Sequence, residues 1–549
     1  MVLDNQEKLN RSRIGEGIYL LYFALMVGAR AAGLYDGMMV YNVILVIGMG
    51  LFAVKMVVTK HTVKEYAMVL VLLGLSGIVY LHTGEKGLLV CFTMMLGMKE
   101  VSVRKAIKTG VIVAGVIILG KICLGVFGIL PEIYYPQERA GAGMMFRHAL
   151  GYAHPNTLHM NVLMLSMMVM YLVTRELQTG KRDEGEVSKD SSEKTAANPV
   201  AALKRNAIVM LAAISGLVFL FNLYIFQYSG SRTGLLACIA FLIVNFWLFV
   251  RKNIGIFEKV VSNGAFPIVG FIAIVLPLVL KGEIFDFVNR TIFTTRFSIA
   301  RYFWQHNSVS LFGIRLNNPD PDMATYGIDM AQLYLFLQLG LVAFAVIALL
   351  TTWYVYMAIK LDARAELAVL MGMLFLGIWE PLLYNLGFKN FTFVFMGAFL
   401  YGVTTGDYGY LEWSHGALSD DSTCGVLGIE VKRLLKLFSL ALIVGIAASM
   451  IYLAATSVPT ALYGDRQEGE SGNKFGMEEL YLSADQVAAL EASGDIVVGY
   501  VDETIPMYQY DAEIASMEYN KRVISVGVWS MMLVAAIGLL LEKVKSKNR

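Results

Sequence analysis

Charged side chains gather in one polar stretch, residues 281–332, which separates two long apolar segments of the chain. Ten of its 52 residues are Asp, Glu, Lys or Arg, whereas the flanking apolar segments 265–280 and 333–358 contain none. A guanidinium group can bind phosphate through paired hydrogen bonds, and a carboxylate can take a proton from a hydroxyl group. The basic residues here are Lys281, Arg290, Arg296, Arg301, His306 and Arg315.

Two of these arginines, Arg296 and Arg301, lie five residues apart in the sequence TTRFSIARYFW. On a helix this offset separates them by about 140°, which favours residues that flank a pocket over residues in one stripe. The neighbouring aromatic side chains are typical of a helix anchored at a membrane interface. An interfacial amphipathic helix that binds no ligand is the simpler alternative.

Two carboxylates are candidates for the general base. Asp329 opens the apolar run YGIDMAQLYLFLQLG, where it could instead serve only to favour a helix N-terminus. Glu380, in LGIWEPLLYN, stands near the end of an apolar segment and directly precedes Pro381. A carboxylate in such a segment is energetically costly, which marks it as a functional candidate.

A tight turn, SGSR, places Arg232 between two apolar segments. Arg232 could be an interfacial arginine whose head group reaches water, or a fixed cation that binds phosphate.

A second stretch, RHALGYAHPN, contains Arg147 and His154 just before another apolar segment. His154 could act as a base or orient a hydroxyl group, or the His-Pro-Asn triplet could merely start a helix. We expect His159, one turn later, to be a packed or hydrogen-bonded core histidine.

Hydropathy predicts a polytopic membrane protein, because mean hydropathy is +0.61 and 57% of residues are apolar. The expected fold is an all-α transmembrane helical bundle. The fourteen predicted spans are 15–33, 37–58, 66–82, 86–98, 108–130, 154–174, 206–228, 233–250, 265–280, 330–358, 366–385, 388–405, 436–458 and 523–541.

Lysine and arginine in the short loops predict the orientation of these spans. With both termini in the cytoplasm, every strongly basic short loop falls on the cytoplasmic side. We therefore expect five parts: N-terminal spans (1–174), a flexible cytoplasmic linker (175–205), core spans (206–458) with an extracytoplasmic loop at 281–329, an extracytoplasmic segment (459–522), and a last span with a basic tail (523–549). Within 459–522, Ser483 could cap a short helix.

Motifs for metals and nucleotides are absent from the sequence. It contains no HExxH motif, no paired CxxC, no Walker loop and no Rossmann glycine pattern. We expect no metal, no cofactor and no nucleic-acid partner.

Three stretches in this order resemble the O-antigen ligase and polymerase superfamily of polysaccharide-assembling membrane proteins. They are RHALGYAHPN, SGSRTGLLA, and the large loop from TTRFSIARYFWQHNSVSLFGI to IDMAQLYLFLQLGLVAF. The resemblance covers residues 140–350, and the flanking spans match only in hydropathy.

The resemblance implies a metal-independent, inverting glycosyltransferase that works on the outer face of the cytoplasmic membrane. Its donor would be an undecaprenyl-diphosphate-linked oligosaccharide and its acceptor a growing polysaccharide chain, with a flippase and a chain-length regulator as further partners. Arg232 and Arg296 match the arginines that would bind the diphosphate, and Arg147 and His154 match the Arg…His-Pro-Asn stretch. Arg301 would be a helper.

One departure separates this chain from the ligases that use a lipid A core. Those ligases carry a His-Asn pair where this chain has Asp329 and Met330. The departure favours a polymerase of repeat units over a ligase and leaves Asp329, Glu380 and His154 as alternative bases. A flippase for a lipid-linked sugar is the alternative from another class. Charges within the predicted spans are scarce, which disfavours a transport path.

Overall fold

The structure is a computed structural model that describes most of the chain. It describes residues 2–130, 134–139, 143–187, 199–323, 326–409, 425–426, 429–458, 462–465, 477–480, 499–502, 505–508 and 512–547. Part of the predicted linker and the predicted helix at Ser483 therefore lie outside the described residues. The chain divides into two units, Met1–Ile117 with Leu163–Asp183 and Leu236–Leu418, and Ile118–Val162 with Glu184–Leu235 and Ser419–Arg549.

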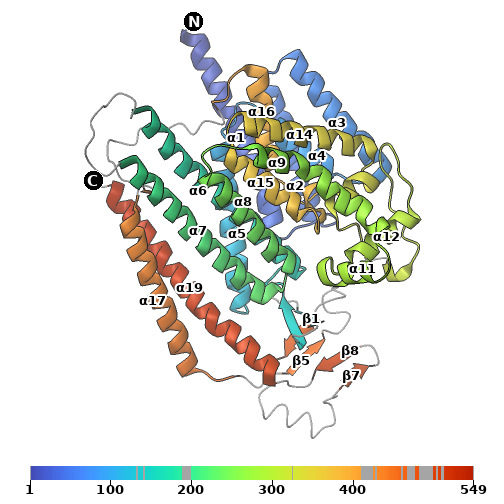
Figure 1. Cartoon of the computed structure of the whole chain (residues 1–549), viewed down its shortest axis with the longest axis vertical. Helices are drawn as coiled ribbons and strands as arrows, with labels where there is room; N and C mark the ends of the chain where they lie inside the picture. The colour runs from blue at the N-terminus through green and yellow to red at the C-terminus, as the bar shows by residue number, and fades with distance from the viewer. Residues whose placement is uncertain are drawn as a thin grey trace. The chain divides into compact units, whose positions relative to one another are not determined.

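The first unit is built from helices (Figure 1). They are α1 (Val2–Ala31), α2 (Met39–Val58), α3 (Val63–Thr83), α4 (Gly87–Leu96), α9 (Ile256–Gly270), η1 (Phe271–Val275), α10 (Leu276–Val279), α11 (Gly282–Phe287), η2 (Val288–Ile292), α12 (Arg296–His306), η3 (Pro321–Met323), α13 (Ala331–Leu333), η4 (Tyr334–Gln338), α14 (Leu341–Lys360), α15 (Arg364–Leu376), η5 (Pro381–Leu383) and α16 (Thr392–Thr405). Helices α5 (Val103–Val126), α6 (Pro155–Val187) and α8 (Arg232–Val250) have residues in both units.

The second unit contains the remaining elements. They are β1 (Tyr134–Arg139), β2 (Gly143–His148), α7 (Pro199–Ser229), β3 (Gly425–Val426), β4 (Ile429–Glu430), α17 (Val431–Ala455), β5 (Leu462–Asp465), β6 (Met477–Leu480), β7 (Gly499–Asp502), β8 (Ile505–Tyr508) and α19 (Ala512–Lys547). Six strands form an antiparallel sheet in the order β2-β1-β6-β5-β8-β7. The sequence did not predict this sheet, because strands of four to six residues are too short for a clear alternating pattern.

The predicted membrane-spanning helical bundle is confirmed at the level of its class. Among the described residues, eleven helices are long and apolar enough to cross a membrane. Two shorter apolar helices, Gly87–Leu96 and Thr392–Thr405, coincide with two more predicted spans. The count of fourteen spans stays a prediction.

Helices α17 and α19 run side by side in the second unit (Figure 1). A side chain added at Gly445 would lie 2.7 Å from the Gly527 carbonyl oxygen, and one added at Gly527 would lie 2.9 Å from that of Gly445. Small residues let helix backbones approach closely in a membrane. These two glycines therefore explain the tight packing of the pair.

An irregular segment, residues 377–391, connects α15 to α16 in the first unit. Helix α15 has 13 residues, a length of ~20 Å, which is shorter than a hydrocarbon core of ~30 Å. Much of the irregular segment is buried, so its backbone polar groups need hydrogen-bond partners within the protein. Tyr41 donates a hydrogen bond to the Leu386 carbonyl (2.9 Å), and Asn390 donates one to that of Leu383 (3.2 Å).

Candidate functional site

Helix α12 begins at Arg296, and the turn before it fixes the direction of this side chain. Thr294 and Thr295 have φ values of 49° and 68°, in the left-handed region. The Asn289 side chain accepts hydrogen bonds from the backbone amides of Phe297 and Ser298, at 3.1 Å each. Asn289 thus satisfies helix-terminal donors that would otherwise lack partners, which anchors the first turn of α12.

Aromatic packing holds this turn against the irregular segment. Phe293 stacks on Phe297, with ring centroids 3.9 Å apart, and on Trp379 at 5.9 Å. The Arg296 Nε atom donates a hydrogen bond of 2.8 Å to the Trp379 carbonyl oxygen. The guanidinium group is therefore held next to the residue that precedes Glu380.

Arg296 lies between the two predicted carboxylates. Its Nε atom is 3.6 Å from Asp329 Oδ2, and its Nη2 atom is 3.6 Å from Glu380 Oε1. The Asp329 side chain is 40% exposed, whereas that of Glu380 is 12% exposed. Desolvation raises the pKa of Asp329 above its ordinary value, although the charge of Arg296 acts in the opposite direction. Asp329 is thus the more accessible of the two carboxylates.

A close helix contact brings Asp329 to this place. The backbone amide of Ala331, at the start of α13, donates a hydrogen bond of 2.8 Å to the Gly377 carbonyl oxygen. A Cβ atom at Gly377 would lie 3.2 Å from that of Ala331 and 3.0 Å from the Leu383 side chain. Glycine at 377 therefore lets the residues after Asp329 pack on the end of α15.

The Arg301 side chain points towards the end of α10. Its Nε and Nη2 atoms donate hydrogen bonds to the Pro277 carbonyl oxygen (3.0 and 2.8 Å), and Nη2 also donates to that of Leu280 (2.6 Å). The guanidinium carbon lies 3.7 Å from the centre of the Phe285 ring. These contacts give Arg301 a structural task, satisfying the carbonyl groups at the end of α10.

The second unit brings Arg147 and the His-Pro-Asn triplet together. Arg147 Nε donates to the Ser229 carbonyl oxygen at 2.7 Å, and Nη2 donates to Asn156 Oδ1 at 2.6 Å. The backbone amide of Asn156 donates to His154 Nδ1 at 3.1 Å. Arg147 therefore joins the end of α7 to the start of α6.

The SGSR turn precedes α8 and leaves the side chain of Arg232 exposed. Ser231 is buried and accepts a hydrogen bond from the Gly234 backbone amide, so it caps α8, while the Arg232 side chain is exposed.

His159 is fully buried and lies 3.0 Å from Ser229 Oγ, which confirms the prediction of a hydrogen-bonded core histidine. A Cβ atom at Gly234 would overlap the His159 ring, so a glycine is required where α8 packs on α6.

The sequence did not reveal a buried ionic cluster in the second unit. His148 Nε2 lies 2.6 Å from Glu518 Oε2, and Lys521 Nζ lies 2.5 Å from Glu518 Oε1. All three side chains are at most 7% exposed. Tyr228 packs edge-on against His148, with ring centroids 5.2 Å apart. Glu518 lies so far along the chain from His148 that no local pattern could link them.

A second unpredicted cluster lies in the first unit. Glu85, between α3 and α4, accepts hydrogen bonds from Tyr334 (2.9 Å) and from Gln338 (2.7 Å). Burial is the largest effect on its carboxyl group and raises the pKa of Glu85. This contact ties π-helix η4, which follows Asp329, to the α3–α4 turn.

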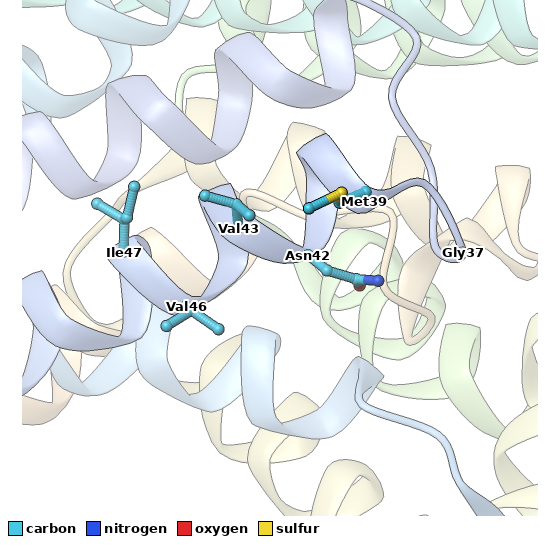
Figure 2. A pocket seen from close by; sticks show the side chains of 6 residues that line it. All are labelled: Gly37, Met39, Asn42, Val43, Val46 and Ile47. Carbon is cyan, nitrogen blue, oxygen red and sulfur yellow. The ribbon is translucent and has the colours of Figure 1, made fainter.

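A shallow hollow of about 480 Å³ lies on α2 and the turn before it. Its lining is mostly apolar and includes the exposed Met39 and Val46 (Figure 2). It is lined by Gly37, Met39, Asn42, Val43, Val46 and Ile47. Exposed apolar side chains on a membrane-spanning helix are expected to face lipid, so we assign this hollow no chemistry.

In the described part of the chain, no three His, Cys, Asp or Glu side chains gather closely enough to hold a metal ion. Comparisons with protein-family models, with characterised proteins and with solved structures found no match. The assignment of a function therefore depends on the chemistry of the residues described above.

Proposed function

We propose that this membrane protein is a polysaccharide polymerase. It joins undecaprenyl-diphosphate-linked oligosaccharide repeat units on the outer face of the cytoplasmic membrane by inverting glycosyl transfer. Both termini are assigned to the cytoplasm, and a flippase and a chain-length regulator are the expected partners. The resemblance of the RHALGYAHPN, SGSRTGLLA and large-loop stretches to the O-antigen ligase and polymerase superfamily supports this proposal.

The observation that carries the proposal is the group formed by Asp329, Arg296 and Glu380. An accessible carboxylate lies 3.6 Å from a guanidinium group whose position is fixed by Trp379 and Glu380. A carboxylate with a raised pKa is a stronger base than an ordinary one. We therefore assign the role of general base to Asp329 and the role of holding Arg296 to Glu380.

In the proposed reaction, Asp329 takes the proton of an acceptor hydroxyl group. The hydroxyl oxygen attacks the anomeric carbon of the donor from the face opposite the diphosphate and forms the new glycosidic bond. The bond between the anomeric carbon and the diphosphate oxygen breaks, and the diphosphate leaves with the electron pair. The configuration at the anomeric carbon is inverted.

Arginine residues are assigned to the diphosphate. Arg232 is exposed at the first turn of α8, so its donors can reach an oxyanion. Arg147 holds the turn before Arg232 through the Ser229 carbonyl group, which suits a supporting role. Fixed cations favour a leaving group on which negative charge develops. Arg296 remains a second candidate for this role, and His154 a second candidate for the base.

Reconstitution of the purified protein with an undecaprenyl-diphosphate-linked oligosaccharide tests the proposal. We expect a ladder of products that differ by one repeat unit and that persists when a metal chelator is added. Arg232→Ala should reduce the rate roughly 100- to 1,000-fold, and Lys281→Ala, at an exposed lysine of the large loop, is the matched control.

Other outcomes would identify other functions. A single product of one transfer to an added acceptor would indicate a ligase. Unchanged ladders in both Arg232→Ala and Asp329→Asn would contradict the assigned site, and loss of the ladder with the chelator would contradict a metal-independent reaction.

A further inference from the structure

The buried lysine at position 389 is not explained by the proposed reaction. Lys389 lies on the irregular segment that also carries Glu380, and it is 7% exposed. In the described residues its ammonium group makes no ion pair or hydrogen bond. Burying an unpaired charge is costly, so such a group calls for a partner or a function.

Its charged neighbours follow a pattern. Arg30 lies beside the same segment: its guanidinium carbon is 5.4 Å from the centre of the Tyr41 ring, and the Tyr41 hydroxyl group donates a hydrogen bond to the Leu386 carbonyl oxygen. The charges of Arg30 and Glu380 both act on Lys389. With the ion pairs already described, the order is Asp329, Arg296, Glu380, Lys389 and Arg30. The signs alternate until Lys389 and then repeat, because Arg30 is a second cation. An anion beside these two cations would complete the alternation.

Arg30 also has an unused donor. Its Nη1 atom donates to the Leu34 carbonyl oxygen at 2.6 Å, but its Nε atom is buried and has no hydrogen-bond partner in the described residues. The nearby Asp36 carboxylate is held by Lys86 at 3.1 Å. No carboxylate of the described chain therefore pairs with Arg30 and Lys389.

Contacts of the two neighbouring residues hold the backbone at Lys389. Phe388 has a φ of 48° and packs against Tyr22 and Phe23 of α1, with ring centroids 5.8 and 5.6 Å apart. Asn390 is tied to the Leu383 carbonyl oxygen. Because the residues on both sides are held, the backbone of Lys389 is held within the protein as well.

We propose that Lys389 and Arg30 form an oxyanion-binding subsite next to Glu380. This inference rests on the proposed function, since it assigns the subsite a charged group of the same substrate. The ligand chemistry is a phosphate or a carboxylate oxyanion. The two sources are the diphosphate of the lipid carrier and an acidic sugar within the repeat unit.

Calorimetric titration of the purified full-length protein tests the subsite. The probes are inorganic pyrophosphate, glucuronate and, as an uncharged control, glucose. Lys389→Met should weaken the binding of one of the two anions ~10- to 100-fold, the loss expected for one charge-assisted hydrogen bond. The anion that is affected identifies the source. Lys281→Met is the control, because Lys281 is exposed on the large loop.

Thermal unfolding gives a second readout that does not depend on ligand. If Lys389 is an unpaired charge kept for binding, Lys389→Met should leave the ligand-free protein as stable as the wild type or more stable. A lower unfolding temperature would overturn the proposal in favour of a structural lysine. Unchanged binding of both anions, or an equal loss of glucose binding, would also overturn it.

The two proposals fail in different ways. A wild-type protein that binds an oxyanion through Lys389 but forms no polymer would contradict the polymerase and leave the subsite intact. Polymer formation with unchanged oxyanion binding in Lys389→Met would contradict the subsite alone.

Discussion

Replacing Arg296 by methionine should destabilise the first unit, because two carboxylates would lose the cation between them. At 3.6 Å and an effective dielectric constant of ~20, each ion pair has a gross attraction of about 4–5 kcal/mol. Solvent reduces this value for Asp329, which is 40% exposed, to ~1 kcal/mol or less. The more buried pair with Glu380 and the bond to Trp379 dominate, so we expect a loss of about 3–5 kcal/mol.

A double-mutant cycle measures this coupling directly. Reversible unfolding in mixed micelles of sodium dodecyl sulfate and dodecyl maltoside would give the free energy of unfolding of each variant. Glu380→Gln in the Arg296→Met background should recover ~2 kcal/mol, because it removes the buried carboxylate that has lost this cation. Arg104→Met is the control: its pair with Glu176 is shorter, at 2.9 Å, but both side chains are more than 30% exposed, so the loss should stay within ~1 kcal/mol. Additive effects of the two site variants would refute the reasoning.

Three further predictions follow from other contacts. Gly87→Ala should disrupt the irregular segment, because its Cβ atom would overlap the Tyr384 carbonyl oxygen, whereas Gly77→Ala, which meets nothing within 4 Å, should be neutral or stabilising by ~1 kcal/mol or less in the same unfolding assay. Glu518→Gln should lower the free energy of unfolding by ~3 kcal/mol or more, because His148 and Lys521 stay buried and lose the carboxylate between them. Glu542→Gln, in a more exposed pair of the same helix, should lower it by ~1 kcal/mol or less. The pKa of Asp329 is higher in the folded protein than its ordinary value of 3.8. The protonated carboxyl group therefore stabilises the folded protein at low pH, and this contribution is lost as the pH rises from 3.8 through the raised pKa. Asp329→Asn should therefore flatten the fall of the unfolding temperature over that range, and an unchanged fall would contradict the assignment.

The helical fold could be predicted from the sequence, because a long apolar segment in a membrane must satisfy its own backbone hydrogen bonds and a helix does so. The candidate residues were harder to place. Arg296, Asp329 and Glu380 were identified by residue type, and in the structure they lie together in the first unit. Arg147, His154 and Arg232 belong to the second unit, and the convergence of all seven predicted residues stays a prediction.

What the sequence could not show depends on contacts between distant segments. The offset between Arg296 and Arg301 predicted different directions, but only the carbonyl groups of Pro277 and Leu280 explain where Arg301 points. Helix α15 ends at Leu376 because residues 377–391 pack irregularly against α1, α2 and α4. Hydropathy alone extended that span to residue 385, since buried irregular backbone and a buried helix can have the same apolar composition.

The most direct test of the central claim measures two products in one experiment. Proteoliposomes containing the protein would receive undecaprenyl-diphosphate-linked oligosaccharide, and released undecaprenyl diphosphate would be counted together with substrate that has crossed the bilayer. The proposed polymerase should release one lipid diphosphate for each glycosidic bond formed, and Asp329→Asn should abolish both. Intact substrate on the opposite side of the bilayer, without release of lipid diphosphate, would contradict glycosyl transfer and indicate a flippase.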